Sequence, residues 1–518
     1  MSRELETPTT FPTEEARSLE IPDWDEYTAS LPWKVMLSPV DPTKGIVEAW
    51  SWIEQEVVRA LCSDREVGDH IVVGPAGFCS REGAGNGIYV ACSGEPEAAK
   101  RILEAYKDRL PRDADIIVDK GFLQDVASQM PLASVQRNAP ERPSTTLHPM
   151  NANYQMLADM GASIGTVGAA SSGTLGCYVV DPEGSWFGIT NCHVLEPSEV
   201  SKEPLPRTLN PGGEISSPSG QDHGIVLAQL ITEKKKAQEK FRGQFFRFLE
   251  DTDQHVTVRK GLKAAVLQAE QMVKEYKKKD RMFGSVLKGF RGVVDGAWVD
   301  VAIMAVKNER RGDNFITYND QSLAVTGWEE PSAGTLVLKI GRSTKDTYGT
   351  ILGQFSRICK LRDDSNAKKS VLVTKEWAIT SDPKVSRLPG LHFMDRGDSG
   401  SAIVRRPNSS EQKVPAVGLL FGGFVGQKVP DLAFFTPAGR VAGALQKLSG
   451  VYLAPACDAT VPAFKFQEYE LKHTPPETEE VLGDDTAQDQ QGESGVVAVE
   501  DVPDIDWTEK QYDLFRDL

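Results

Sequence analysis

Short apolar segments separated by polar turn residues recur from about residue 151 to residue 460. The segments are rich in Val, Ile, Leu and Phe, and Gly, Pro, Asp and Ser fill the gaps between them. Many short strands with frequent turns are typical of an antiparallel sandwich or barrel. The sequence therefore predicts a mainly β domain over 151–460. The clearest strand candidates are Thr174–Val180, Trp186–Thr190, Val299–Val306, Thr335–Ile340, Val371–Ile379, Ser401–Val404 and Ala416–Phe421.

Residues 31–135 have a different pattern, in which apolar residues at helical spacing alternate with strand-like apolar runs. This alternation predicts a small α/β domain with a βαβ-like unit. Its glycine-rich stretches do not fit a phosphate-binding pattern, so they are interpreted as turns and no nucleotide site is assigned. The helices are expected at Gly45–Ala60 and Glu95–Leu110, and the strands at His70–Val73, Gly87–Ala91 and Ala114–Val118.

Residues 232–285 interrupt the β pattern with a high density of Lys, Glu and Gln. Apolar residues with alternating spacings of four and three form the seam of an amphipathic helix. We interpret this segment as a helical insertion in the β domain. Two roles stay open, a solvated surface hairpin and a docking surface for a protein partner. The seam consists of Leu262, Val266, Ala269, Val273 and Tyr276.

The two ends of the chain lack a periodic apolar face. Residues 1–30 are predicted to be disordered, and 136–150, rich in Pro, Ser and Thr, to be a linker. Residues 461–518 hold 16 Asp or Glu and 4 Lys or Arg, which is −12 of the net charge of −16. This acidic tail is either solvated, or its apolar residues between Asp504 and Leu518 fold onto this protein or a partner.

Composition limits the class of protein. A chain of 518 residues with 40% hydrophobic and 25% charged residues indicates a soluble globular protein of two or three domains. The polar, acidic start lacks the pattern of a secretory signal, and no 18-residue apolar run exists. Seven scattered cysteines without a CxxC pair favour a reduced, intracellular location, cytoplasmic or nuclear. No membrane partner is expected, and without a basic face no nucleic-acid partner is expected either.

The strongest chemical signal is the sequence Gly397-Asp398-Ser399-Gly400-Ser401. A serine with glycine on one side and Gly-Asp on the other suits a nucleophile on a tight turn, because small neighbours let a substrate carbonyl approach. The N–H groups of Gly397 and Ser399 are expected to form an oxyanion hole. The motif indicates a serine peptidase, and the alternative is an ordinary polar turn.

A serine nucleophile requires a base, and His193 is the best of the seven histidines. It follows the apolar strand candidate Trp186–Thr190, and the end of a strand is a rigid place for a base. His223 and His392 are weaker candidates.

The carboxylate that orients the base is expected to be Asp300. It stands alone among apolar residues in Trp298-Val299-Asp300-Val301-Ala302, where a buried carboxylate needs a specific partner. An imidazole N–H would be such a partner. The alternatives are a strand-edge aspartate that faces water, and Asp222 as the orienting carboxylate.

The order His193, Asp300, Ser399 is that of the chymotrypsin-type triad. The template has about 45 residues from His to Asp and about 93 from Asp to Ser. Here the second interval is 99 residues, and the first is 107, or 53 once the segment 232–285 is removed.

Five motifs together resemble the trypsin-like (chymotrypsin-fold) serine peptidases over about 165–445, especially the intracellular type of bacteria, fungi and plants. The motifs are Gly173–Cys177, Ile189–Val194, Val299–Ile303, Gly397–Ser401 and Val417–Gly423. The resemblance implies a double β-barrel with the triad His193, Asp300 and Ser399. It also implies protein or peptide substrates and no metal or organic cofactor.

The segment Lys339-Ile340-Gly341-Arg342-Ser343-Thr344 is similar to the Gly-Arg-Thr-Thr segment of bacterial members of this class. In those enzymes the arginine pairs with the aspartate that precedes the nucleophile. The resemblance therefore implies that Arg342 pairs with Asp398 and supports the oxyanion loop without an activating cleavage.

The resemblance also implies which residues bind substrate. Phe393, six positions before the nucleophile, occupies the usual floor of the S1 pocket, and Leu420, Phe421 and Gly422 lie on the strand that aligns the substrate backbone. Without a carboxylate at the floor, an apolar or small P1 residue is expected. Two other functions remain open, a catalytically silent protease-fold scaffold that binds partners and an esterase with the same triad.

Overall fold

The computed structural model describes residues 35–80, 83–124, 153–169, 172–196, 207–245, 253–319, 321–362, 369–382, 392–408, 411–426 and 431–456. The predicted disordered N-terminus, the linker 136–150 and the acidic tail 461–518 lie outside these ranges. None of the helices in these ranges has the length and apolar character that a membrane span requires.

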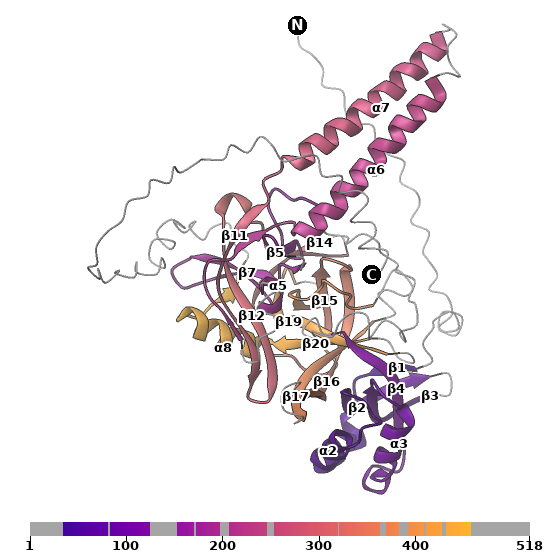
Figure 1. Cartoon of the computed structure of the whole chain (residues 1–518). Helices are drawn as coiled ribbons and strands as arrows, with labels where there is room; N and C mark the ends of the chain where they lie inside the picture. Colours follow the sequence, from indigo (N-terminus) through magenta and orange to yellow (C-terminus); the bar gives the residue numbers. More distant parts are fainter. Residues whose placement is uncertain are drawn as a thin grey trace, which may run out of the picture.

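The body of the molecule is built from two curled, mostly antiparallel sheets, as Figure 1 shows. Within the described residues, one sheet has nine strands in the order β21-β7-β8-β12-β11-β10-β5-β6, with β9 paired to β11. The mainly β fold predicted from the sequence is confirmed. The strands of this sheet are β5 (Ser163–Thr166), β6 (Gly173–Thr174), β7 (Cys177–Val180), β8 (Trp186–Thr190), β9 (Arg207–Leu209), β10 (Glu214–Ser216), β11 (Met282–Val294), β12 (Ala297–Val306) and β21 (Ala454–Pro455).

The other sheet has twelve strands in the described part of the chain, in the order β1-β2-β3-β4-β19-β18-β15-β16-β17-β20. The pair β13–β14 joins it through β19. Eight of its strands come from the second half of the chain, namely β13 (Phe315–Tyr318), β14 (Gln321–Trp328), β15 (Leu336–Gly341), β16 (Lys345–Arg362), β17 (Lys369–Ser381), β18 (Ala402–Arg405), β19 (Lys413–Gly426) and β20 (Leu432–Pro437).

The remaining four strands belong to the N-terminal unit, in which helices alternate with strands as the sequence predicts. The buried face of its first helix has Ile46, Trp50, Ile53, Val57 and Leu61 at spacings of three and four. The elements are β1 (Val35–Ser38), η1 (Pro42–Lys44), α2 (Ile46–Ser63), β2 (His70–Ser80), β3 (Gly83–Cys92), α3 (Pro96–Glu104), η2 (Lys107–Arg109) and β4 (Ala114–Gln124).

The N-terminal unit is joined to the second sheet by backbone pairing. β2 pairs antiparallel with β16, and the end of β4 pairs antiparallel with the end of β19, from Gly121↔Gly426 to Gln124↔Gly423. These pairings cover edges of β16 and β19 that would otherwise present unpaired amides. The N-terminal unit therefore extends the sheet on which the serine motif lies.

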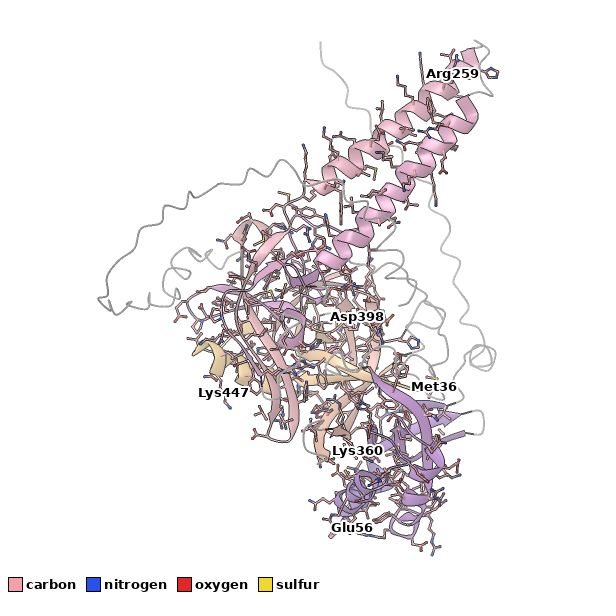
Figure 2. All side chains as sticks on the ribbon, viewed as in Figure 1. Met36, Glu56, Arg259, Lys360, Asp398 and Lys447 are labelled. Carbon is pink, nitrogen blue, oxygen red and sulfur yellow. The ribbon has the colours of Figure 1, made fainter. Side chains whose placement is uncertain are left out.

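Two long helices, α6 (Gly220–Phe245) and α7 (Asp253–Lys277), form a hairpin that projects from the sheets (Figure 1). Together they occupy most of the segment 232–285, but α6 begins twelve residues earlier and β11 begins at Met282. At the base of the hairpin the rings of His223 and Tyr276 stack, with centroids 4.7 Å apart. In Figure 2, Arg259 marks the far end of the hairpin and Asp398 lies among the sheets.

Three elements bring the predicted catalytic residues to the region between the two sheets. The short helix α5 (Cys192–Leu195) contains His193, β12 contains Asp300, and Ser399 lies in the turn before β18. The helix α8 (Ala438–Ser449) packs on β12 and β19, and a short helical turn, η5 (Asn308–Arg310), follows β12. All ten residues of β12 are buried, which makes it a rigid support.

Candidate active site

His193 lies at the point where β8 ends and α5 begins. The side-chain amide of Asn191 donates to the Leu420 carbonyl of β19 at 2.6 Å, and the Thr190 hydroxyl donates to the Thr174 carbonyl at 2.7 Å. The first of these bonds crosses from the first sheet to the second. The backbone before His193 is therefore fixed relative to the strand beside Ser399.

The structure brings His193 and Asp300 together. Nδ1 of His193 lies 2.6 Å from Oδ2 of Asp300, and the His193 backbone N–H donates to Oδ1 at 3.2 Å. His193 is 7% exposed and Asp300 is 1% exposed. The carboxylate thus has two donors from one residue, and the bond to Nδ1 leaves Nε2 as the ring atom that can accept a proton.

A further charged group contacts Asp300 from the neighbouring strand. Arg291 lies directly opposite Asp300 in the β11–β12 register, and its Nε is 3.3 Å from Oδ2 of Asp300. The same guanidinium lies 3.2 Å from Glu196, which also pairs with Arg207 at 3.2 Å. Glu196, Arg207, Arg291 and Asp300 form a buried network of two cations and two anions, named here the histidine-side network.

This network affects the acidity of Asp300. Burial raises the pKa of the Asp300 carboxyl, but the His193 ring and the Arg291 guanidinium outweigh burial and hold that pKa below its ordinary value. Asp300 therefore stays ionised, which is the state that can orient an imidazole and stabilise its cation. Burial raises the pKa of the neighbouring Cys192 thiol, which makes it a packing residue.

Ser399 lies in a turn between two glycines with left-handed backbone. Gly397 and Gly400 both have φ of +93°, and a Cβ at Gly400 would collide with the Thr190 hydroxyl. Ser399 Oγ donates to the Phe421 carbonyl at 3.4 Å, and within the described residues Nε2 of His193 makes no hydrogen bond. Bonds between catalytic groups are often long without substrate.

Two peptide groups in this turn have defined directions. The Asp398 carbonyl accepts from the Ser401 N–H at 3.0 Å and from the Ser401 hydroxyl at 2.6 Å. The Arg396 carbonyl accepts from the Ser343 hydroxyl, and from Nη1 of Arg342 at 3.5 Å. In a trans peptide the following N–H points away from the carbonyl. The N–H groups of Ser399 and Gly397 therefore point away from the donors that hold the Asp398 and Arg396 carbonyls. Neither N–H donates a hydrogen bond within the described residues.

The ion pair predicted between Arg342 and Asp398 is wrong. Asp398 instead pairs with Lys339, whose Nζ lies 3.0 Å from Oδ2, and both side chains are at most 1% exposed. The backbone N–H groups of Ser343 and Thr344 donate to Oδ1 of Asp398 at 2.8 and 3.2 Å. The physical reason is direction, because Lys339 lies within β15 and faces inward, whereas Arg342 follows the end of that strand.

Arg342 pairs with Asp222, which the sequence placed second for the role of orienting carboxylate. Nε of Arg342 donates to Oδ2 of Asp222 at 2.5 Å, and Nη2 donates to Oδ1. The Arg342 side chain still packs against the oxyanion loop, since a Cβ on Gly397 would collide with its Nη1. Lys339, Asp398, Arg342 and Asp222 form a second set of buried charges, named here the serine-side network.

The residues predicted to bind substrate lie around this turn but are buried. Phe393 and Leu420 belong to one apolar cluster of the second sheet, and Phe421 belongs to another. Gly422 pairs with Phe434 of β20. The ammonium of Lys339 lies 5.5 Å from the centre of the Phe393 ring. Their contact with substrate stays a prediction.

Sequence reasoning missed three charged residues around the site, namely Lys339, Arg291 and Glu196. Lys339 interrupts an apolar strand run, which is the same signal that identified Asp300, whereas Arg291 stands among glycines and close to Lys288. Glu196 directly follows α5 and had no comparable signal. In the described residues no group of His, Cys, Asp and Glu side chains suits a metal ion.

A serine on a glycine turn and a histidine held by a buried aspartate, in a mainly β fold, define a trypsin-like serine endopeptidase. The profile of peptidase family S64 matches residues 128–453, which is more than half of the chain, and the chain belongs to this family. It is a hydrolase that acts on protein or peptide substrates.

Solved structures of several proteases resemble the chain at low identity. Thermobifida fusca protease A is 13% identical, with a TM-score of 0.29, and the match covers 58% of this chain and 100% of that one. Nocardiopsis protease is 12% identical, with a TM-score of 0.29 and coverage of 57% and 97%. Cellulomonas bogoriensis chymotrypsin is 13% identical, with a TM-score of 0.28 and coverage of 58% and 99%. No curated protein matches the sequence.

Proposed function

We propose that His193, Asp300 and Ser399 are the catalytic triad of this endopeptidase. The observation that carries the proposal is the buried contact of 2.6 Å between Nδ1 of His193 and Asp300, which fixes the ring so that Nε2 is the basic atom. Because the Asp300 carboxyl is ionised, it stabilises the imidazolium that forms during the reaction.

The reaction is acyl transfer. Nε2 of His193 takes the proton of the Ser399 hydroxyl as Oγ attacks the scissile carbonyl carbon, and the electron pair of the carbonyl moves to its oxygen. The N–H groups of Gly397 and Ser399 bind this oxyanion. Removal of one such donor raises the activation free energy by about 2.7–4 kcal/mol. The oxyanion then re-forms the carbonyl, the C–N bond breaks, and His193 gives its proton to the leaving amine, which leaves an acyl ester on Ser399. Water, deprotonated by His193, attacks this ester. The C–Oγ bond breaks, the acid product is released, and His193 returns the proton to Ser399 Oγ.

We further propose that the enzyme prefers an apolar or small P1 residue. Phe393 and Met394 precede the nucleophile where a carboxylate would have to stand to attract Lys or Arg. Peptide substrates that differ only at P1 test the preference, and faster cleavage after Lys or Arg would contradict it.

A fluorophosphonate probe tests the triad, because it reacts only with an activated serine. We expect the full-length enzyme to be labelled at Ser399, and Ser399→Ala or His193→Ala to abolish labelling and peptide hydrolysis. Ser51→Ala, which removes an exposed hydroxyl on α2 far from this turn in the sequence, is the matched control and should keep a labelled Ser399. If neither the full-length protein nor a variant that ends at residue 460 is labelled, the chain is a catalytically silent scaffold. Ester hydrolysis without peptide hydrolysis would indicate an esterase.

A further inference from the structure

We propose that Asp222 is a positioning residue for the oxyanion hole and acts through Arg342 on the peptide that presents the Gly397 N–H. The proposal rests on the proposed function of Ser399 and assigns a role to the first turn of α6. Asp222 does not touch the triad, and His193 has Asp300 as its carboxylate partner. Any contribution of Asp222 to catalysis must therefore pass through Arg342.

The contact between Asp222 and Arg342 is bidentate and buried. Nε and Nη2 of Arg342 donate to the two oxygens of Asp222, which is fully buried, while Arg342 is 6% exposed. The Ser163 hydroxyl adds a third donor to Oδ2 of Asp222 at 2.5 Å. A bidentate arginine–carboxylate pair fixes the plane of the guanidinium as well as its position.

The third nitrogen of the guanidinium points at the oxyanion loop. Nη1 of Arg342 donates to the Arg396 carbonyl at 3.5 Å and to the Ser343 hydroxyl at 3.2 Å, and that hydroxyl donates to the same carbonyl. Because the carbonyl of a trans peptide opposes the following N–H, these donors set the direction of the Gly397 N–H. The space for the guanidinium exists because residue 397 is glycine, since a Cβ there would occupy the position of Nη1.

The Arg342 backbone is fixed by the same region. Its N–H donates to Thr174 Oγ1 at 3.0 Å, and that hydroxyl donates to the Gly397 carbonyl at 2.8 Å. The side chain of Arg342 would remain rotatable without Asp222, because its other partners engage only Nη1. Asp222 is thus the group that keeps Nη1 on the Arg396 carbonyl, and it does so from the base of the helical hairpin.

Asp222→Asn tests the proposal in the full-length enzyme. It keeps the volume of the side chain and removes the charge and one acceptor. We expect kcat for peptide hydrolysis to fall about 10–100-fold with KM within about twofold, because an oxyanion donor acts on the transition state and its complete loss costs about 10²–10³ in kcat. Labelling of Ser399 by the fluorophosphonate should slow by a similar factor. Glu270→Gln is the control, since it breaks the Lys234–Glu270 contact within the hairpin and should change neither rate.

The outcomes separate the two proposals. Absence of labelling both in the full-length enzyme and in the variant that ends at residue 460 contradicts the triad. Normal labelling of the full-length enzyme together with an unchanged kcat in a folded Asp222→Asn protein overturns the role of Asp222 and leaves a purely structural ion pair. If Asp222→Asn does not fold, Asp222→Leu with Arg342→Met replaces both charges by apolar groups, a change that buried ion pairs often tolerate. That protein should fold with the same low kcat, and a normal kcat would overturn the proposal.

Discussion

The two buried charge networks flank the proposed triad in different ways. In the histidine-side network the charges act on side chains, because Arg291 and His193 both contact the Asp300 carboxylate. In the serine-side network the charges hold backbone, because Asp398 accepts the N–H groups of residues 343 and 344, and Arg342 donates to the Arg396 carbonyl. One network keeps the Asp300 carboxylate ionised, and the other sets the direction of hydrogen-bond donors.

This difference predicts two kinds of damage. Loss of a charge on the histidine side should change proton transfer and its pH dependence, with the turn around Ser399 intact. Loss of a charge on the serine side should leave the base intact and displace the oxyanion donors, or unfold the loop that presents them. Each network keeps equal numbers of cations and anions, so removal of one member leaves a buried charge without compensation.

Asp300→Asn should have the largest effect, a fall of about 10⁴ in kcat, because the amide cannot hold the imidazole in its reactive tautomer or stabilise its cation. Asp222→Asn removes the same charge from the other network and should cost far less. Peptide hydrolysis by the two purified variants, with unchanged near-UV spectra as the check on folding, measures this contrast. Equal losses in the two variants would mean that Asp300 does not orient the base.

Lys339→Met should have the largest effect on stability. Burial lowers the pKa of the Lys339 ammonium, Asp398 opposes this effect, and removal of the ammonium leaves Asp398 buried without a cation. Breaking a buried pair in this way costs about 3–5 kcal/mol of the free energy of unfolding. Urea unfolding of the variant measures the loss.

The matched control for Lys339 is Lys375→Met. Lys375 pairs with Glu54 at 2.6 Å but is 55% exposed, so its loss should cost no more than about 1 kcal/mol. Addition of Asp398→Asn to Lys339→Met should recover part of the lost stability without recovery of kcat. If Lys339→Met is as stable as the control, Lys339 is not the cation that compensates Asp398.

The sequence was sufficient to predict features that depend on one local segment. The helical spacing of Ile46, Trp50 and Ile53 predicts α2, and the apolar run around Asp300 predicts the buried strand β12. Because an isolated carboxylate in such a strand must have a partner, the same pattern also predicts the contact between Asp300 and His193. Local burial alone determines these assignments.

The choice among several cations and anions could not be predicted in this way. Lys339 and Arg342 are three residues apart, and Asp222 and Asp300 are both near the predicted insertion, so spacing does not decide which charges meet. The outcome depends on where β15 ends, at Gly341, and where α6 begins, at Gly220. Successive side chains of a strand point to opposite faces. An error of one residue in the predicted end of β15 therefore changes which of Lys339 and Arg342 is expected to face Asp398.

Arg291→Gln should have the smallest effect on catalysis and the clearest pH signature. His193 and Arg291 hold the Asp300 pKa below its ordinary value against the opposing effect of burial, so Asp300 contributes stability above its unfolded pKa and loses it as pH falls through the folded pKa. Without Arg291 the folded pKa rises, and acid unfolding should begin at a higher pH. We expect kcat/KM at neutral pH to fall by about tenfold or less, and Arg291→Lys to restore part of both losses.

Denaturant unfolding at a series of pH values from neutral to acid measures the shift, and Arg101→Gln, which breaks the exposed pair with Glu66, is the control. An acid limb identical to that of the control would show that Arg291 does not influence the charge of Asp300, and would remove the distinction between the two networks.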